Sequence, residues 1–470
     1  MEQTKSDEHK KVKNNIIKNS IPTIIAFILS DVFTMIDTML IGSISDEKIY
    51  TASLSAINVT ARVMLFISAL SRGMNVASST ILSRYIANNN KEKMQSTIIH
   101  TIILNVFFIS LPLVIISLIF MKKIIIFIGN DPIIYDVGKG YYIAIMIGFI
   151  FSSFNNIFAF LSRSVCEAKR TLYMESFANI FNILGDIVLI NGLFVFPKLG
   201  VTGAGVATLI YKIILTIMWL VVLFKSKSRL RINTEYKFRF DKRMIKDILH
   251  TGVPASTELL SIRGANIIFT KIISGLGTSV LAAQQICMTI FNLIIEVGNA
   301  LSVSVAPLVS ECIGKCKYEV AKIYVRYSKK IAIVISTVIG LLIIVLSTPL
   351  LNLYTDSETV KSIVKNVLMI IIIAQYAQNI RDVYAGGLRG SGDTKYIAKY
   401  TILTDVLLKV ILSYICVNIL KFDLVSVWII IALQECLKAI IFYRRFHSDS
   451  WKNIKVIDRL GEEEYDKIKQ

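Results

Sequence analysis

The sequence predicts an all-α polytopic membrane protein with about 12 transmembrane helices in two parallel six-helix lobes. Hydrophobic residues make up 54% of the 470 residues, and the mean hydropathy of +0.62 is far above that of a soluble enzyme. Apolar runs of about 20 residues, long enough for a helix to cross a bilayer, recur from one end of the chain to the other. The longest basic connection, residues 225–247, lies at the centre of the chain and separates six runs from six.

Polar connections bound each apolar run and so set its limits. In chain order the predicted spans are 20–43, 53–80, 97–120, 138–160, 173–195, 203–224, 249–275, 282–308, 330–352, 363–387, 398–420 and 425–444. The first run is too long and too acidic for a signal peptide and lacks a small-residue cleavage site, so we expect it to remain as the first span.

An internal repeat relates the two groups of six spans. Arg163-Ser-Val-Cys-Glu-Ala-Lys169 aligns with Arg389-Gly-Ser-Gly-Asp-Thr-Lys395, and Ile21-Pro22 aligns with Val253-Pro254. Because each half holds an even number of spans, we expect the halves to share one orientation in the membrane and to face each other across a cavity.

Lys and Arg are concentrated in alternate connections, which predicts that these connections and both termini are cytoplasmic. The predicted organisation is a cytoplasmic N-terminal segment (1–19), an N-lobe (20–224), a basic cytoplasmic linker (225–247), a C-lobe (248–445) and a cytoplasmic tail (446–470). We attribute the net charge of +19 to the membrane topology and not to nucleic acid binding, because the basic residues lie in the connections between apolar runs.

The tail offers two alternatives. Its apolar residues share one helical face, which suits a helix at the membrane surface, and a solvated tail fits the sequence equally well. These residues are Trp451, Ile454, Ile457 and Leu460.

The first span carries two carboxylates, Asp31 and Asp37, into apolar sequence. A carboxylate at the bilayer centre costs roughly 2.5–3.5 kcal/mol on insertion scales, so it normally has a partner or a task. The first hypothesis for this span is therefore an ion or proton site. Asp31 lies on a different helix face from Asp37, and we expect it to form a structural pair with Arg62 or Arg72 of the second span.

The fifth span presents a matching polar face. Asn179, Asn182 and Asp186 stand at i, i+3 and i+7, which places two amides and a carboxylate on one side of a helix. Oxygen ligands on that face, converging with Asp37, suit a hard monovalent cation, so Na+ is expected at Asp37, Asn182 and Asp186. Hydrogen bonding between helices is the alternative, because it is common for Asn in membranes.

Polar residues in the second half form a weaker pattern. The candidate residues for lining a substrate cavity are Glu258, Gln375, Gln378, Asn379 and Asp382. Packing between the lobes explains the stripe on the tenth span equally well. Asp405 and Lys409, at i and i+4, are expected to neutralise each other.

Three motifs in this order resemble the MATE (multidrug and toxin extrusion) transporters. They are Pro22 followed by Ile36-Asp37-Thr38-Met-Leu-Ile-Gly42, Gly200-Val-Thr-Gly-Ala-Gly-Val-Ala-Thr208, and Gly387-Leu-Arg-Gly-Ser-Gly-Asp-Thr-Lys395. The resemblance covers the chain from Ser20 to about Tyr443 and is closer to the DinF-type, MepA-like pattern than to the NorM type.

The resemblance implies a MATE/MOP-type fold and a function. The expected function is a secondary active antiporter of the cell membrane that exports cationic or amphipathic drugs and toxins in exchange for Na+ or H+, by alternating access. The expected partners are such small molecules and the lipid bilayer, with no nucleic acid, no cofactor beyond the coupling ion, and a monomeric state.

The resemblance also assigns roles in the first half. Asp37 matches the acidic residue of the family's first helix, and Asn182 and Asp186 match positions where part of the family binds Na+. Thr208 looks like the hydroxyl that completes this site. The alternative for Asp37 is a structural carboxylate satisfied by a neighbouring Arg or by hydroxyls, and interhelical hydrogen bonding is the alternative for Thr208.

The second half departs from the NorM-type pattern. Glu258 follows Pro254 by too few residues to match the NorM-type acidic position. Gln378 aligns with the family's tenth-helix acid better than Asp382 does. The NorM-type roles are therefore not transferred to these residues.

Rival functions are a lipid-linked saccharide flippase of the same superfamily and an integral-membrane enzyme. The flippases usually have more spans and a strongly basic cavity, whereas the basic residues of this chain lie between its apolar runs. An enzyme would need clustered His, Cys or carboxylates near one interface, so it is not expected. Gly203-Ala-Gly205 predicts close helix packing and not a dinucleotide site. The chain has no P-loop motif, which predicts that transport takes its energy from an ion gradient and not from ATP.

Overall fold

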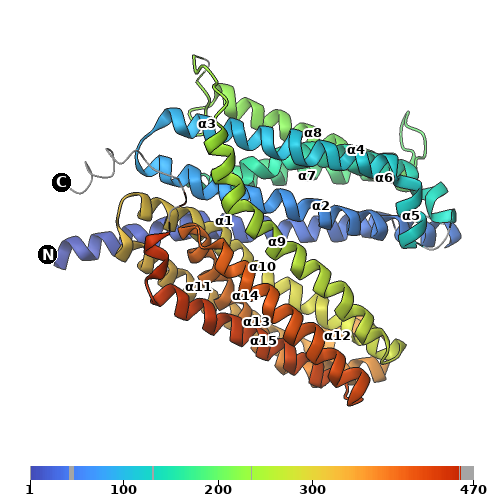
Figure 1. The fold of residues 1–470 in the computed structure, drawn as a ribbon. Coiled ribbons are helices and arrows are strands. Elements are labelled where there is room, and N and C mark those ends of the chain that lie inside the picture. Colours follow the sequence, from blue (N-terminus) through green and yellow to red (C-terminus); the bar gives the residue numbers. More distant parts are fainter. Residues whose placement is uncertain (1, 42–46, 130–131, 234, 455, 457–470) are drawn as a thin grey trace. The chain divides into compact units, whose positions relative to one another are not determined.

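The computed structural model describes residues 2–41, 47–129, 132–233, 235–454 and 456. Every regular element in these ranges is helical, which confirms the all-α class (Figure 1). Three residues used in the sequence analysis lie outside these ranges: Gly42, which ends the first motif, Ile457 and Leu460.

The helices of the first half are long, and each of the six predicted spans there begins inside a helix that starts earlier in the chain. They are α1 (Glu2–Ile41), α2 (Glu47–Ala87), α3 (Lys91–Ile102), η1 (Ile103–Ser110), α4 (Leu111–Ile119), α5 (Met121–Gly129), α6 (Pro132–Ser164), α7 (Ala168–Asn191) and α8 (Val201–Lys225). The segment η1 is a π-helical stretch that joins α3 to α4, and Pro112, which has no N–H to donate, follows it directly.

The helices of the second half follow a connection whose described residues, 226–233 and 235–241, form no helix. They are α9 (Lys242–Ser274), α10 (Thr278–Gly314), α11 (Tyr318–Val345), α12 (Ser347–Tyr354), α13 (Glu358–Ser391), α14 (Thr394–Thr404), η2 (Asp405–Leu412), η3 (Ile415–Ile419), α15 (Leu424–His447) and η4 (Ser450–Asn453).

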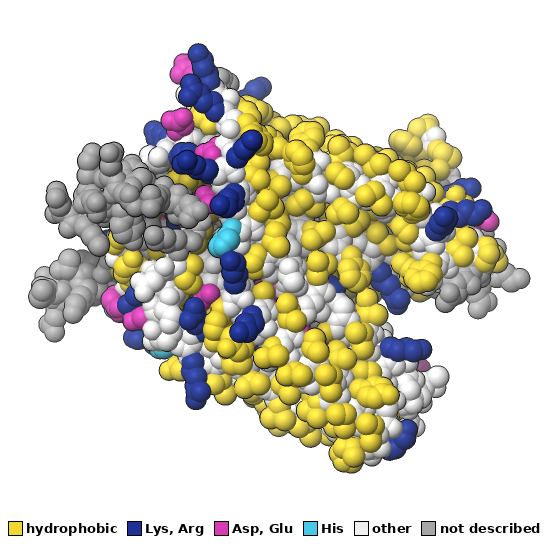
Figure 2. Space-filling view, viewed as in Figure 1, with side chains coloured by type: hydrophobic (Ala, Val, Ile, Leu, Met, Phe, Trp, Pro, Cys, Tyr) yellow, Lys and Arg dark blue, Asp and Glu magenta, His cyan; other side chains and the backbone are white. Residues whose placement is uncertain are grey.

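Eleven helical segments in the described ranges are long and apolar enough to cross a membrane, which confirms a polytopic membrane protein. Side chains on these helices are mainly hydrophobic, whereas Lys and Arg gather near helix ends (Figure 2). The predicted seventh span, 249–275, corresponds to α9, which is not one of the eleven. Its helical length is sufficient, but Glu258, Arg263 and Lys271 interrupt its apolar sequence.

The chain forms two compact units. The N-terminal unit is Ile25–Leu249, and the C-terminal unit is His250–Gln470 together with Met1–Ile24. The beginning of α1 belongs with the C-terminal unit because its polar face bonds there: Asn15 Nδ2 donates to the Tyr324 hydroxyl at 3.1 Å, and Asn19 Nδ2 donates to the Ser304 carbonyl at 3.3 Å. The predicted segment 1–19 is therefore continuous in structure with the first span.

Small residues let helices approach closely in both units. In the N-terminal unit, a Cβ added at Gly203 would lie 2.5 Å from the Leu189 carbonyl oxygen, which confirms that Gly203-Ala-Gly205 serves helix packing. In the C-terminal unit, a Cβ at Gly386 or Gly390 would lie 2.6 or 2.3 Å from a carbonyl oxygen of α10. Backbone contact of this kind leaves no room for a larger side chain.

The two units share one turn at the positions that the repeat aligned. Cys166 and Gly392 both have left-handed backbone, with φ of 59° and 92°. The N–H of each bonds back to its aligned arginine carbonyl, Cys166 to Arg163 at 3.2 Å and Gly392 to Arg389 at 3.0 Å. The next residue in each turn bonds to the carbonyl five positions earlier, which completes a Schellman-type helix end. The aligned segments therefore have the same local structure.

The described part of the tail is packed into the protein. Trp451 is 0% exposed, its ring stacks on Phe446 at 5.1 Å, and its indole N–H donates to the Phe446 carbonyl at 2.6 Å. Trp451 is thus buried against α15 and lies neither in solvent nor at a membrane surface. Ile457 and Leu460, which complete the predicted apolar face, lie outside the described residues.

Candidate ion site in the N-terminal unit

The candidate site joins the last turn of α1 to the middle of α7. Asp37 lies one turn before α1 ends, and α7 begins after the turn at Cys166 and ends at Gly192, which takes the left-handed conformation of a helix C-terminus at φ 71°. The helical period then brings Asn182 and Asp186, four residues apart, to one face of α7.

Asn182 connects the two carboxylates. Its side-chain amide N–H donates to Asp186 Oδ2 at 2.8 Å and to Asp37 Oδ1 at 3.3 Å. The carboxyl groups of Asp37 and Asp186 also lie close enough to hydrogen-bond to each other. We call these three side chains the Asp37 cluster. The structure thus brings together the three residues that the sequence analysis assigned to a cation.

Two oxygens of the Asp37 cluster have no hydrogen-bond partner. They are Asn182 Oδ1 and Asp186 Oδ1, on residues that are 2% and 1% exposed. Within the described ranges no Lys or Arg lies within ion-pair distance of either carboxylate. Buried oxygens without a donor are costly to the fold, and a proton or a bound cation at this position would compensate for that cost.

The donor set fits a small hard cation. Carboxylate and amide oxygens are the ligands of such ions, whereas Zn2+ and similar metals prefer His and Cys. The described residues contain no group of three or more His, Cys, Asp or Glu side chains that could hold a metal. Asp37, Asn182 and Asp186 are the residues that would hold Na+.

Thr208 directly follows a residue of α8 that packs against α7 next to Asp186. A Cβ added at Gly185 would be 3.0 Å from the Ala207 side chain, so α7 and α8 touch one residue before Asp186 and Thr208. Thr208 is half-buried. Asn179, by contrast, donates to the Glu175 carbonyl of its own helix at 2.8 Å, so its amide is occupied outside the cluster.

Tyr141 of α6 is a neighbour that the sequence analysis missed. It interacts electrostatically with both Asp37 and Asp186 and packs against Ile190 of α7 and Ala204 of α8. Gly205 makes room for it, since a Cβ there would lie 3.1 Å from Tyr141. A tyrosine in an apolar run gives no signal of this position, because its neighbours depend on how α6, α7 and α8 pack.

Asp31 does not have the partner that was predicted. Among the described residues it forms no ion pair with Arg62 or Arg72, and both arginines are exposed. The predicted structural pair is therefore wrong among the described residues, where Asp31 is half-buried and both arginines are exposed.

The candidate cavity residues of α13 are bonded inside the C-terminal unit. Gln375 Nε2 donates to the Ser336 carbonyl at 3.3 Å, and Asn379 Nδ2 donates to the Ser336 hydroxyl at 2.8 Å. Gln378 is 8% exposed. These amides join α13 to α11 within one unit.

The acids of the C-terminal unit are paired with arginines. Glu258 accepts from Arg389 at 2.6 Å, and Asp382 accepts from Arg381 at 2.7 Å. Arg381 also lies 3.2 Å from Glu435. Such pairing offsets the charge of each acid inside the protein.

Asp405 is paired with a lysine other than the predicted one. Lys438 of α15 lies 2.6 Å from Asp405, whereas Lys409 donates to Asn266 of α9 at 2.6 Å. The predicted Asp405–Lys409 pair is wrong, because α15 presents a buried lysine to Asp405 and α9 offers an acceptor to Lys409.

Comparison with known proteins decides the family. The MatE family matches this chain twice, over residues 22–188 and 254–415. The chain belongs to the MatE family. The two matches fall in the two halves that the internal repeat relates.

Relatives of this MatE chain span most of its length. The uncharacterized transporter YisQ of Bacillus subtilis (strain 168) is 25% identical over 426 residues, which cover 88% of this chain and 90% of that protein. The probable multidrug resistance protein NorM of Photorhabdus laumondii is 24% identical over 382 residues, 80% of this chain and 82% of that protein.

Solved structures confirm the MATE/MOP-type fold. A MOP superfamily transporter from Pyrococcus furiosus superposes with a TM-score of 0.86 at 22% identity, covering 94% of this chain and 97% of that one. An outward-facing multidrug resistance MATE family transporter gives a TM-score of 0.85 at 21% identity, with the same coverage. At this level of identity the likeness establishes the fold alone.

Proposed function

We propose that this MatE protein is a secondary active antiporter that exports cationic or amphipathic drugs and toxins in exchange for Na+ or H+. Family membership and relatives named as multidrug resistance proteins support an export function. The observation that carries the mechanism is the Asp37 cluster, in which the half-buried Asp37 and the buried Asp186 have no basic partner among the described residues. Its chemistry demands a positive charge from outside the chain.

The same cluster explains coupling. A cation or proton at Asp37 and Asp186 relieves the repulsion between the carboxylates and supplies a partner for the unbonded oxygens. Such a ligand stabilises any lobe arrangement that keeps the cluster closed. Antiport then requires that substrate bind better to the other arrangement, because coupling is a difference in affinity between two states.

Within the family, we place the chain nearer to the DinF-type, MepA-like pattern than to the NorM type. The carboxylates without a basic partner are those of the N-terminal unit, while Glu258 and Asp382 of the C-terminal unit each face an arginine. An ion site in the N-terminal unit alone follows from this difference. The candidate cavity role of the α13 residues remains a proposal.

The proposal also gives the cellular location of the protein and names the reactions that it does not catalyse. A multi-pass protein of the cell membrane with both termini cytoplasmic fits the alternation of basic connections. Action without an enzymatic step fits the transporter names of the relatives. Action without ATP hydrolysis fits the absence of a P-loop motif in the sequence. The proposal also takes the protein to act as a monomer.

The first prediction concerns Asp37. Purified protein in liposomes should export a fluorescent cationic substrate when an ion gradient is imposed, and Asp37→Asn should abolish that export because the amide cannot exchange a proton or neutralise a cation. Asp186→Asn should act in the same direction.

Asp31→Asn is the matched control, since it removes a carboxylate from the same helix at a site outside the Asp37 cluster. We expect it to export at close to the wild-type rate. Wild-type export by Asp37→Asn, with the protein correctly inserted, would refute the proposed role.

A further inference from the structure

The connection between α8 and α9 is built onto α3. The backbone N–H of Asp241 donates to His100 Nε2 at 2.8 Å, and Lys93 Nζ lies 3.0 Å from Asp241 Oδ2. Thr97 of α3 contacts Met244 at the start of α9. These bonds hold the end of the connection in a defined position in the N-terminal unit.

Two aromatic side chains of the connection pack against the same histidine and still face outward. The rings of Phe238 and Phe240 lie 5.1 and 5.6 Å from the His100 ring, yet they remain 41% and 54% exposed. They alternate with Lys237 and Arg239 in the sequence. Aromatic and basic side chains mixed in this way, directly beside the ends of apolar helices, are typical of the membrane interface.

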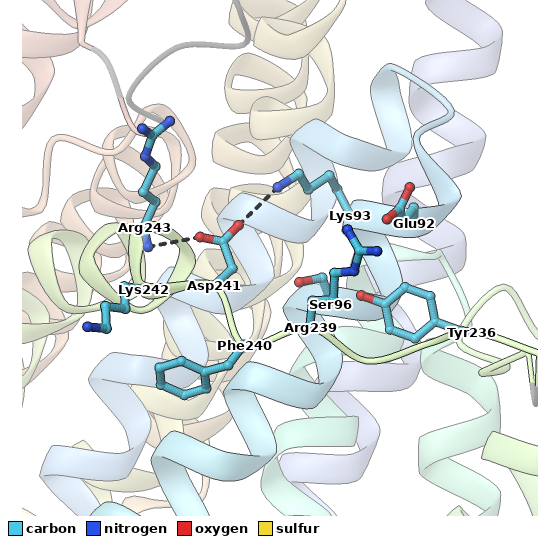
Figure 3. A pocket seen from close by; sticks show the side chains of 9 residues that line it. All are labelled: Glu92, Lys93, Ser96, Tyr236, Arg239, Phe240, Asp241, Lys242 and Arg243. Atoms are coloured by element: carbon cyan, nitrogen blue, oxygen red, sulfur yellow. Dashed lines mark hydrogen bonds and ion pairs between the residues drawn. The ribbon is translucent and has the colours of Figure 1, made fainter.

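A pocket of about 410 Å3 opens between this connection and the first turns of α3 (Figure 3). Lys93 is held by Asp241, which leaves Arg239, Lys242 and Arg243 as lining cations without a carboxylate partner among the described residues. All three are exposed. The pocket therefore has basic groups available for an anion.

The other lining residues suit a phosphate ester. Ser96 and Tyr236 contribute hydroxyl groups that donate hydrogen bonds, and Phe240 adds an apolar wall. Glu92 also lines the pocket, but the cations outnumber the acids. Guanidinium groups bind phosphate oxygens in pairs, which gives this lining a geometric preference for phosphate.

We propose that this linker pocket binds the headgroup phosphate of an anionic phospholipid. The position of the pocket favours a lipid over a soluble phosphate, because the exposed Phe238 and Phe240 place it where acyl chains meet headgroups. The surrounding connection adds attraction through further basic residues outside the pocket, which are Lys225, Lys227, Arg229, Arg231, Lys237 and Lys246. The bound lipid would fix the connection against the bilayer.

The test uses the full-length protein in detergent and native mass spectrometry with added phosphatidylglycerol or phosphatidylcholine. The pocket variant is Arg239→Gln with Arg243→Gln. The matched control is Lys227→Gln with Arg229→Gln, which removes the same charge from the same connection outside the pocket. We expect the pocket variant to bind phosphatidylglycerol roughly ten- to thirty-fold more weakly, because it loses two charge-assisted contacts to phosphate, and the control to lose clearly less, because its residues add only diffuse attraction.

Each outcome decides the proposal. Selective weakening by the pocket variant, in protein that elutes as a single folded species, supports a phosphate site. Arg239→Lys with Arg243→Lys should then restore binding only in part, because a lysine does not pair with two phosphate oxygens. Equal weakening by the pocket and control variants would mean diffuse surface charge and would overturn it. Competition by glycerol phosphate at the lipid's own concentration would overturn it too, because the pocket would then take a soluble anion.

Discussion

The amide of Asn182 donates to both carboxylates of the Asp37 cluster, whereas the amide of Asn179, one turn earlier on α7, donates to a backbone carbonyl. Asn182→Leu keeps the approximate size of the side chain but removes this bridge. We expect the ion affinity that drives export to fall on the order of 10- to 100-fold, as for groups that orient metal ligands.

Asn179→Leu is the control for this prediction and should leave the ion dependence unchanged. Export by both variants is measured over a range of Na+ concentration and pH. An equal loss in Asn179→Leu would mean that any amide on this face serves packing.

A second effect at the residue scale is the pH dependence of the linker tether. Burial tends to raise the pKa of Asp241, but hydrogen bonds from Lys93 and from the backbone N–H groups of Met244 and Arg243 outweigh burial and lower it. A lowered pKa in the folded state means that the tether contributes fully above the ordinary carboxyl value of about 3.9 and is lost as the pH falls through the lower folded value.

Hydrogen exchange of the backbone N–H groups of Arg243 and Met244, which both donate to Asp241 Oδ1, tests this sign after correction for intrinsic rates. Protection should stay constant from about pH 7 to pH 5 and fall only in more acidic solution. In Asp241→Asn the protection should be weaker throughout and without that acidic step. Loss of protection in the wild type near neutral pH would contradict the assigned cause.

At the scale of helices, glycine contacts set the distance between α10 and α13. A Cβ at Gly390 would meet the Ala306 carbonyl oxygen at 2.3 Å, while a Cβ at Gly264 of α9 meets nothing within 4 Å. Gly390→Ala should therefore lower stability by about 1–3 kcal/mol, because the two backbones must separate. Thermal unfolding in detergent should show a lower Tm for Gly390→Ala but not for Gly264→Ala. A similar Tm for both variants would mean that the helices adjust without cost.

Charge is distributed differently among the helices of the two units. The buried network of the C-terminal unit contains equal numbers of cations and carboxylates, namely Arg381, Arg389, Lys409 and Lys438 with Glu258, Asp382, Asp405 and Glu435. That network is balanced without an external ion. The Asp37 cluster has no such balance, which is why we assign ion coupling to it.

Helical periodicity and the cost of buried charge were sufficient to predict the main parts of the fold and the candidate site. The long apolar runs predicted the membrane helices, and the spacing of Asn182 and Asp186 predicted a shared face toward Asp37. Both arguments use only neighbours along one helix, for which sequence distance translates directly into spatial distance.

Partners on different helices were not predictable in the same way. The choice of Lys438 for Asp405 and the position of Tyr141 beside the Asp37 cluster depend on which helices pack together and at what height. Asp31 illustrates the same limit, since arginines of the right charge on the next helix form no ion pair with it among the described residues. Sequence spacing within one helix contains no information on that choice.

At the scale of the whole molecule, the central claim is that the Asp37 cluster exchanges a cation or proton for substrate. This claim requires counter-ion movement in a fixed ratio to export, and it requires that the ratio depend on Asp37. The C-terminal unit, with its acids paired, should contribute no ion of its own.

The most direct measurement is counter-ion flux in liposomes that contain purified protein, recorded for Na+ and H+ separately while a cationic substrate is added. The account predicts substrate-driven movement of one of these ions by the wild type and by Asp31→Asn, and none by Asp37→Asn. Substrate transport by Asp37→Asn that moves the same ion in the wild-type ratio would contradict it.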